Sequence, residues 1–484
     1  MKKLLETTVS ISTTEIVLII VALIKNKYLA ISIGPEGFGI YGLLLSFFNL
    51  AAVFSGTWLS TGATKYISEY SEQKDNNSVD RVYSFTVGLA SVISVSMAII
   101  MMVASENIRQ LFLTEDVLPI YFLLFSVAFI GNSLRPVFLA MLQGLKKIRI
   151  VIHSRIMISI FEILAIVSLV YFFEMLGFMI SICISSIFTL IVFVYYFRKM
   201  NFRIAIKYVM FDEVSIKLMK YGGINIFLAF GNLGAQFLQR KIILANMDLM
   251  SVGILHAAIS IRNYSDIVGR GSGFYFLPRM SERLNKITRI QEINDYIYFS
   301  TVSYFVIGMS ILLFRNEIIT LLLSPEFIAV GSVLAWFIVA EFLHNIERPL
   351  GQTIIGTAAL RTHSINTAGI FLSWIVFPII YAPSIGVKSI ALGSIIGSLI
   401  SMFNSSLYLR KSIKYTPNYR NILLACFVLM CFFSATLIAN SVAYKIMVLF
   451  GVILICILSL SKTERIRLSS LLKSSLSKIM EKRT

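Results

Sequence analysis

The chain has 484 residues, of which 57% are hydrophobic and only 14% are charged. Because soluble domains carry about 25% charged residues, this composition excludes an ordinary soluble fold and indicates a membrane protein. The net charge of +18 would suggest nucleic-acid binding in a soluble chain. No basic groove with interleaved aromatic residues accompanies it, so nucleic acid is excluded as a partner.

Apolar stretches long enough to cross a bilayer recur along the chain. A transmembrane helix needs about 20 mostly apolar residues. We therefore expect fourteen spans, at residues 9–31, 40–62, 82–104, 117–142, 151–173, 176–197, 218–245, 250–278, 296–314, 329–356, 364–381, 385–409, 421–440 and 442–461. The fourth, seventh, eighth and tenth are polar for membrane helices, which predicts that they line a wet space or pack inside the bundle.

Basic residues between the spans predict the orientation of the chain. If both termini lie inside, the inner loops and tails hold 29 Lys or Arg residues. The outer loops then hold only Arg109, Arg315, Lys388 and Lys445. By the positive-inside rule, this asymmetry places both termini in the cytoplasm.

A motif with a charge inside an apolar span occurs twice. Asn-Ser-Leu-Arg-Pro at 132–136 returns 213 positions later as Asn-Ile-Glu-Arg-Pro at 345–349. Lys27 likewise corresponds to Lys241 in a second matched segment, at an offset of 214. A duplicated hydrophobic half with a charge in each copy is typical of transporters.

The repeat predicts the domain organisation. Each copy holds six spans, and an even number returns the chain to the same side, so the copies are parallel and related by an axis along the membrane normal. We expect an all-α integral membrane protein with two parallel six-helix lobes and two extra C-terminal helices. The expected units are an N-terminal lobe, a cytoplasmic linker, a C-terminal lobe, and two helices with a basic cytoplasmic tail, at residues 1–198, 199–217, 218–410 and 411–484.

Three charges in the eighth span are spaced for one helical face. Arg262, Asp266 and Arg270 follow one another at i, i+4 and i+8. Two guanidinium groups around one carboxylate suit a phosphate or pyrophosphate, because arginine pairs with phosphate oxygens bidentately. The alternative is an ion-pair network between helices that binds no ligand.

The two duplicated arginines, Arg135 and Arg348, each precede a proline. Proline leaves a carbonyl without its helical partner, so each motif predicts a kink that carries a charge. Either the arginines line the space between the halves, or each satisfies the carbonyls that its proline frees. Glu347 beside Arg348 has Leu134 as its counterpart, so the halves differ here.

Other charges in or near the spans are weaker candidates. Glu15 in the first span either carries a coupling proton or cation, or pairs with a neighbouring base. Three basic residues near outer helix ends either line the cavity or snorkel to the interface: Lys27, Arg240 and Lys241. A cluster at the inner part of the fifth span is expected to be interfacial: His153, Arg155 and Glu162.

Signatures of catalysis are absent from the sequence. It has no Gly-rich phosphate loop, no metal-spaced His or Cys cluster and no nucleophile triad. The four cysteines lie inside apolar segments and have no metal spacing. We therefore expect a transporter, not an enzyme, with no cofactor and no ATP drive; protons, sodium ions, the membrane potential or substrate flux remain as energy sources.

Three segments resemble a known family. They are Ile-Gly-Pro-Glu-Gly-Phe-Gly-Ile-Tyr at 33–41, Thr-Gly-Ala-Thr-Lys-Tyr-Ile-Ser-Glu-Tyr at 61–70 and Leu-Gln-Gly-Leu-Lys-Lys at 142–147. Together they look like the bacterial polysaccharide flippases of the multidrug/oligosaccharidyl-lipid/polysaccharide superfamily. Among these, the chain is most similar to the Wzx-type translocases of O-antigen and enterobacterial common antigen.

The resemblance implies two lobes around a cationic cavity that opens alternately to each side of the bacterial inner membrane. Such a protein moves an undecaprenyl-pyrophosphate-linked oligosaccharide from the cytoplasmic to the periplasmic leaflet, and a polysaccharide polymerase and a chain-length regulator are further expected partners. A lipid II flippase and a multidrug exporter of the same superfamily are the alternatives. A sugar polymerase is disfavoured because no large outer loop is present, and a membrane scaffold would not explain the paired arginines.

Overall fold

The computed structural model describes residues 2–113, 117–200, 212–266, 269, 276–277, 279–282, 284–357, 359–435 and 442–459, and these residues contain helices but no strand. The expected all-α fold is therefore confirmed. In chain order the helices are α1 (Lys2–Ala52), η1 (Val53–Thr57), α2 (Leu59–Glu72), α3 (Asn76–Val103), α4 (Ser105–Phe112), α5 (Pro119–Gly144), α6 (Ile148–Lys199), α7 (Glu213–Asn246), α8 (Leu249–Ser265), α10 (Lys286–Leu313), α11 (Arg315–Leu322), η3 (Pro325–Phe327), α12 (Val330–Gly356), α13 (Leu360–Ile385), α14 (Lys388–Ile413), α15 (Tyr419–Ala435) and α16 (Val442–Ser459).

Eight helical stretches in the described part of the chain are long and apolar enough to cross a membrane. Two of them, 17–72 and 148–199, each contain two of the expected spans. Helix α7 and the 17-residue helix α8 are not among the eight, whereas α5 and α12, which contain most of the fourth and tenth expected spans, are. The structure thus supports a multi-pass membrane protein, but it does not establish the count of fourteen.

Local backbone features separate spans inside the two long stretches. Helix α1 bends at Gly34, whose φ of 60° lies in the left-handed region that glycine adopts without strain. Pro35 follows directly and removes a helical donor. Helix α6 bends at Glu174, where φ is 46°. Each bend lies between two expected spans.

Short polar side chains cap helices where the chain re-enters the bundle. In each case a side-chain oxygen accepts a hydrogen bond from the backbone N–H three residues later and satisfies one unpaired donor. The capping residues of α3, α7, α8 and α10 are Asp75, Asp212, Asp248 and Asn285.

The eighth expected span, residues 250–278, is described only in part. Helix α8 ends at Ser265, and Asp266 lies in a turn. The rest of the span, at 267–268, 270–275 and 278, lies outside the described residues.

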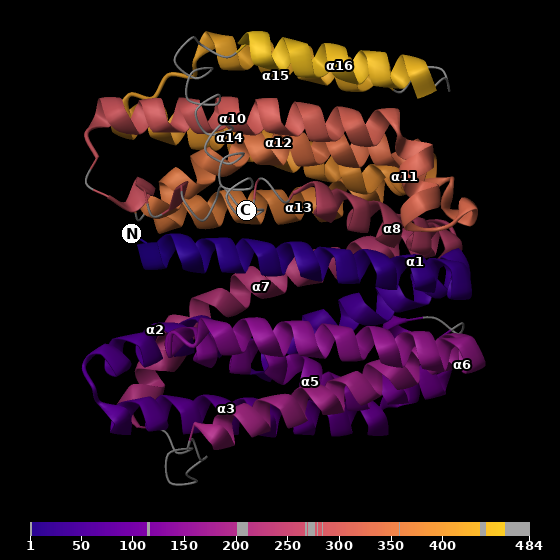
Figure 1. The fold of residues 1–484 in the computed structure, drawn as a ribbon, viewed down its shortest axis with the longest axis vertical. Helices are drawn as coiled ribbons and strands as arrows, with labels where there is room; N and C mark the ends of the chain where they lie inside the picture. Colours follow the sequence, from indigo (N-terminus) through magenta and orange to yellow (C-terminus); the bar gives the residue numbers. More distant parts are fainter. Residues whose placement is uncertain are drawn as a thin grey trace, which may run out of the picture.

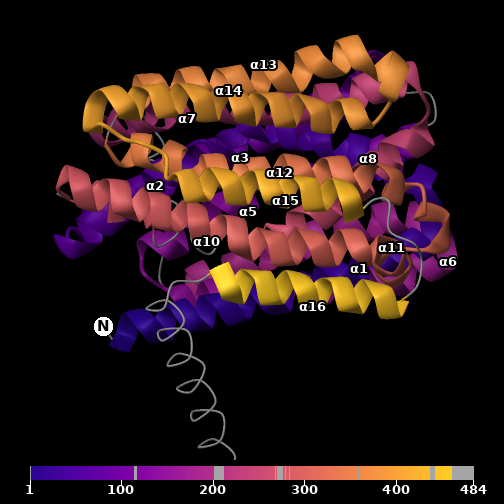
Figure 2. The ribbon, with the colours of Figure 1, turned by 90° about the horizontal axis from the view of Figure 1, so that it is seen from above.

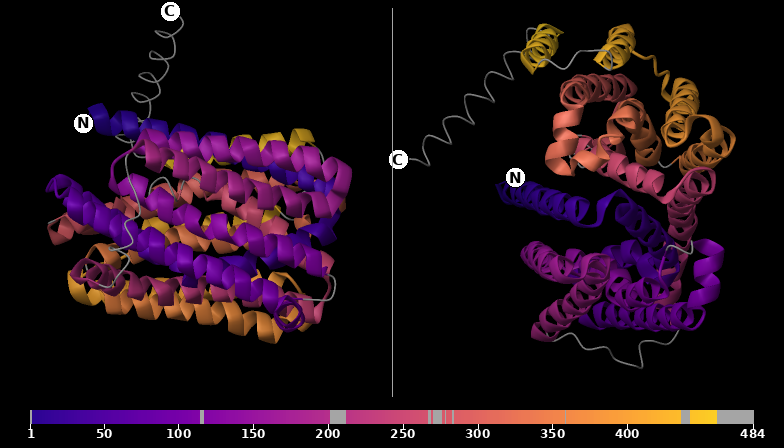
Figure 3. Two further views of the ribbon diagram at one scale, coloured as in Figure 1. Left: turned by 90° about the horizontal axis from the view of Figure 1, so that it is seen from below. Right: turned by 90° about the vertical axis from the view of Figure 1, so that its right-hand side faces the viewer.

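The helices lie side by side in two groups (Figure 1). One group contains α2, α3, α5 and α6, and the other contains α8 and α10 to α14. Helices α1 and α7 lie between the groups: α1 packs against α6 and α8, and α7 packs against α2 and α13. The end-on view in Figure 3 shows both groups, with the start of α1 projecting between them.

The largest buried core joins the two groups at the end where α1 bends. Phe38 of α1 contacts Phe327 of η3, with ring centroids 5.1 Å apart. Phe47 of α1 contacts Phe237 of α7 at 5.8 Å. A second core, built around Phe138 and neighbours on α2, α3, α5 and α6, also includes Leu218 near the start of α7. The two halves are therefore packed together at the Gly34 end.

Helices α15 and α16 lie along α10 at the outer edge of the second group (Figure 2). The buried Lys445 of α16 donates to Glu317 of α11 at 2.6 Å, and this hydrogen bond lowers the pKa of the Glu317 carboxyl. Arg420 at the start of α15 lies over the ring of Tyr298 at 4.7 Å. Polar contacts at both ends thus hold the two extra helices to the bundle.

Candidate functional site

Each half of the bundle contains a polar cavity. The first has a volume of about 290 Å³, and its charged lining residues are Lys25, Arg135 and Glu162. The second has a volume of about 380 Å³, and its charged lining residues are Arg262, Asp266, Glu341, Glu347 and Arg348. Polar cavities inside membrane-spanning helices are expected at functional sites, because buried charge in a bilayer is costly.

The first cavity carries an excess of positive charge. Lys25 of α1 forms an ion pair with Glu162 of α6, with Nζ 2.9 Å from Oε1. Arg135 of α5 lines the same cavity and is only half-buried. In the described part of the chain no carboxylate lies within 4.0 Å of the Arg135 guanidinium. This guanidinium is therefore free to pair with an anion.

The second cavity contains three carboxylates and two arginines. Arg348 of α12 donates to Asp266 at 2.8 Å and lies 3.8 Å from Glu341. Arg262 of α8 lies 3.4 Å from Glu341. These pairs support the alternative that the charges of α8 form an ion-pair network between helices. The helical spacing holds from Arg262 to Asp266 only, and Arg270 lies outside the described residues.

Glu347 distinguishes the second cavity from the first. Its Oε1 accepts a hydrogen bond from Ser401 at 2.7 Å, and its Oε2 lies 3.9 Å from His344 Nδ1. Its counterpart Leu134 is apolar, as the sequence showed. The duplicated arginines thus lie in different surroundings: Arg135 has no carboxylate within 4.0 Å among the described residues, and Arg348 is held by carboxylates. Helices α5 and α12 both continue through the proline of the motif.

Close packing holds the ion pair between α8 and α12. A side chain at Gly269 would place its Cβ less than 3.0 Å from Arg348 and Asn345. We expect Gly269→Ala to displace the ends of the Arg348 and Asn345 side chains and lower stability by about 1 kcal/mol, the low end of the cost of overpacking, because these flexible ends can shift. Gly369→Ala is the control, because a Cβ there meets nothing within 4 Å. Thermal unfolding of both variants in detergent measures the difference; equal melting temperatures would contradict the packing argument.

Lys27 and Lys241, which the repeat relates, make equivalent bonds between the two halves. Lys27 of α1 donates to the carbonyl of Thr320 in α11 at 2.6 Å. Lys241 of α7 donates to the carbonyl of Leu113, just after α4, at 3.1 Å. Both lie at the closed end of the bundle, and neither lines the two cavities. Their role as substrate contacts remains a prediction.

Two glycines that the repeat relates, Gly39 and Gly253, also make matching contacts with the opposite half. A Cβ at Gly39 would overlap the backbone carbonyl of Leu249, and a Cβ at Gly253 would overlap that of Pro35. The repeat offset of 214 relates Gly39 to Gly253 and also Pro35 to Leu249. Paired contacts of this kind are the signature of a two-fold arrangement. They also bring the backbones of α1 and α8 into direct contact.

The remaining candidate residues are Arg240, Glu162 and Glu15. Arg240 is buried and donates to the carbonyl of Gln236 on its own helix at 2.8 Å. Glu162 is not part of an interfacial cluster, because it points into the first cavity and pairs with Lys25. The side chain of Glu15 lies outside the described residues.

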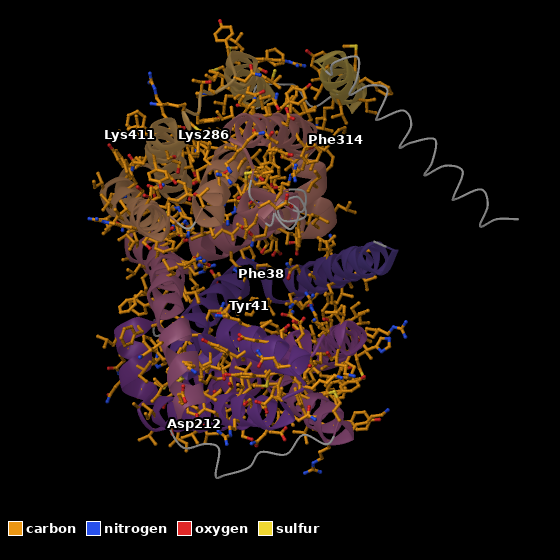
Figure 4. The ribbon with its side chains drawn as sticks, turned by 90° about the vertical axis from the view of Figure 1, so that its left-hand side faces the viewer. Phe38, Tyr41, Asp212, Lys286, Phe314 and Lys411 are labelled. Atoms are coloured by element: carbon orange, nitrogen blue, oxygen red, sulfur yellow. The ribbon has the colours of Figure 1, made fainter. Side chains whose placement is uncertain are left out.

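Sequence reasoning missed Lys25 as a site residue. Its only signal was a basic residue within an apolar span. The neighbouring Asn26 donates to the hydroxyl of Tyr264 on α8 at 2.8 Å. Adjacent residues of α1 are thus bonded to different halves, Lys25 to α6 and Asn26 to α8. Figure 4 shows α1 between the halves, marked by Phe38 and Tyr41.

Comparisons with known proteins agree with this architecture. The model of the family "Polysaccharide biosynthesis protein" matches residues 4–282. The chain is similar to the lipid III flippase of Escherichia coli (strain K12), with 23% identity over 361 residues that cover 73% of this chain and 86% of the flippase.

Solved structures show the same fold. The lipid II flippase MurJ in an inward closed conformation superposes with a TM-score of 0.74 at 17% identity, covering 96% of this chain and 99% of MurJ. An inward-facing multidrug resistance transporter of the MATE family, in the MOP superfamily, superposes with a TM-score of 0.69 at 15% identity. The match covers 82% of this chain and 94% of the transporter.

Proposed function

The chain belongs to the family of polysaccharide biosynthesis proteins, and we propose that it is a flippase that moves a lipid-linked oligosaccharide across the bacterial inner membrane. It is a transporter in this proposal and not an enzyme. The family, the similarity to the lipid III flippase and the fold of the MOP superfamily support this function. Transport runs from the cytoplasmic to the periplasmic leaflet, with both termini in the cytoplasm.

One observation about the site carries the proposal. Among the described residues that line the first cavity, Arg135 has no carboxylate within 4.0 Å, while Lys25 and Glu162 pair with each other. A guanidinium in a low-dielectric site attracts a phosphate strongly, because the charge-assisted hydrogen bonds are bidentate. The substrate is therefore an anionic lipid-linked sugar, with undecaprenyl pyrophosphate as the carrier. The lipid tail stays in the bilayer between helices.

The domain organisation forms part of the proposal. The lobes at 1–198 and 218–410 are related by a rotation of about 180° around the membrane normal. The reciprocal contacts of Gly39 with Leu249 and of Gly253 with Pro35 support this relation. A polysaccharide polymerase and a chain-length regulator are the proposed downstream partners, because a flipped repeat unit must be polymerised.

Transport assays with purified protein test the substrate class. In proteoliposomes we expect transfer of an undecaprenyl-pyrophosphate-linked oligosaccharide between leaflets, measured as access of the sugar to a membrane-impermeant enzyme. Lipid II and a cationic drug serve as the comparison substrates. Faster transfer of lipid II would indicate a peptidoglycan-precursor flippase, and drug transport alone would indicate a multidrug exporter.

A further inference from the structure

A buried histidine lies in the contact between the two halves. His256 is on the second turn of α8 and is 8% exposed. Its ring meets Phe38 and Tyr41 of α1 edge to face, with centroids 5.7 and 5.3 Å apart. A Cβ at Gly42 would lie 3.2 Å from the imidazole, so α1 packs directly against this side chain.

The imidazole has a polar atom without a partner. Nδ1 of His256 is buried and has no hydrogen-bond partner in the described part of the chain. A buried polar atom left without a partner loses the hydrogen bonds that water would supply, which costs free energy. The closed contact between α1 and α8 therefore holds this side chain in unfavourable surroundings.

The charges around His256 oppose its protonation. From α1 the titratable groups that face it are Lys25 and Tyr41, and from α7 it is Arg240. Both charged neighbours are cations, although the charge of Lys25 is offset in part by its ion pair with Glu162. Among the described residues, no carboxylate lies within 4.0 Å of the ring. An imidazolium in this contact would be desolvated and repelled, so the closed contact favours the neutral ring.

We propose that His256 is a proton-binding site in the contact between the halves, and that a proton bound there favours separation of α1 from α8. When the halves separate, water reaches the ring and stabilises the charged imidazolium. The open form therefore binds the proton more tightly than the closed form. By linkage, a fall in pH shifts the population toward the open form.

The proposal rests on the proposed flippase function only for its biological role. With the orientation predicted from the basic loops, this contact closes the periplasmic side. A proton from the periplasm would then open the cavity toward the leaflet where the substrate is released. Because a single proton is involved, the ratio of open to closed molecules changes at most about tenfold per pH unit.

Spin-label distances test the proposal without any substrate. Gln110 on α4 and Leu321 on α11 are exposed, and they belong to different halves at the closed end. Labels are placed at these positions after the four cysteines are replaced by serine. In detergent micelles between pH 8 and pH 5, we expect a longer distance to gain population as the pH falls.

Substitutions assign the effect to His256. We expect His256→Gln, which stays neutral, to abolish the pH dependence, and His256→Arg to show the longer distance already at pH 8. His153→Gln is the matched control, because His153 is exposed near the start of α6 and lines neither cavity, so its loss should leave the pH dependence unchanged. If His256→Gln does not fold, His256→Asn takes its place, and size-exclusion profiles verify folding.

Two results would overturn the proposal: a distance in the wild type that does not change with pH, or a pH dependence that persists in both neutral variants. Failure of the flippase function is a separate result, since the distance measurement requires no transport. If the pH response is present and no lipid-linked sugar moves, the proton site stands and the substrate assignment fails.

Discussion

Replacement of Arg135 by alanine is expected to lower the rate of oligosaccharide transfer about 10- to 100-fold at unchanged protein levels. A hydrogen bond to a charged group contributes about 1.5–3 kcal/mol, and each 1.4 kcal/mol corresponds to a factor of ten. Arg135→Lys should be milder, because lysine keeps the charge but loses the bidentate geometry. The measurement is the initial transfer rate in proteoliposomes, normalised to the amount of reconstituted protein.

The control for this experiment is Arg149→Ala. Arg149 is exposed at the start of α6 and lines neither cavity. Its loss should leave the transfer rate unchanged. Full transfer by a well-expressed Arg135→Ala variant would contradict a role in substrate binding. Arg348→Ala is less diagnostic, because it also removes the hydrogen bond from Arg348 to Asp266 and so changes the ion-pair network of the second cavity.

Reversal of one charge in the pair between Lys25 and Glu162 is expected to lower stability by about 3 kcal/mol. Loss of one partner of a buried ion pair costs about 3–5 kcal/mol, because it leaves a charge without compensation. We expect a loss at the lower end of this range, because the side chains of Lys25 and Glu162 are still 21% and 25% exposed. The variants are Lys25→Glu, Glu162→Lys and the double swap, compared by thermal unfolding in detergent.

The double swap should recover most of the stability, because the attraction returns with opposite polarity. The pair formed by Lys146 and Glu72 provides the control: both side chains are well exposed, so the same swap there should change little. A double swap as unstable as the single variants would show that Lys25 and Glu162 act separately. In that case, the positive charge of the first cavity would need another origin.

Several features of the site followed from the sequence because they depend on local order. The duplicated motif predicted Arg135 and Arg348 inside equivalent helices, and the structure places both on cavity walls. The helical period predicted that Arg262 and Asp266 share a surface, and both line the second cavity. Beyond Asp266, most of the eighth expected span lies outside the described residues, so its end stays a prediction.

The assignments that were wrong or missed depend on distant parts of the chain. Glu162 was expected at the interface, but it pairs with Lys25, 137 positions away. The sequence left two roles open for Arg348, and neither included the bond from its guanidinium to Asp266, 82 positions away. No spacing rule within one helix predicts such partners, since they depend on how two helices are rotated and shifted against each other.

The sequence by itself determined the membrane class, the internal duplication and the helices that carry intramembrane charge. These follow from hydropathy, repeat offsets and the cost of burying charge in a bilayer, all of which act along the chain. Only the tertiary structure decided which charges neutralise one another. It left Arg135 without a carboxylate partner and enclosed His256 against α1, because pairing depends on distances of a few ångströms between helices that are far apart in the sequence.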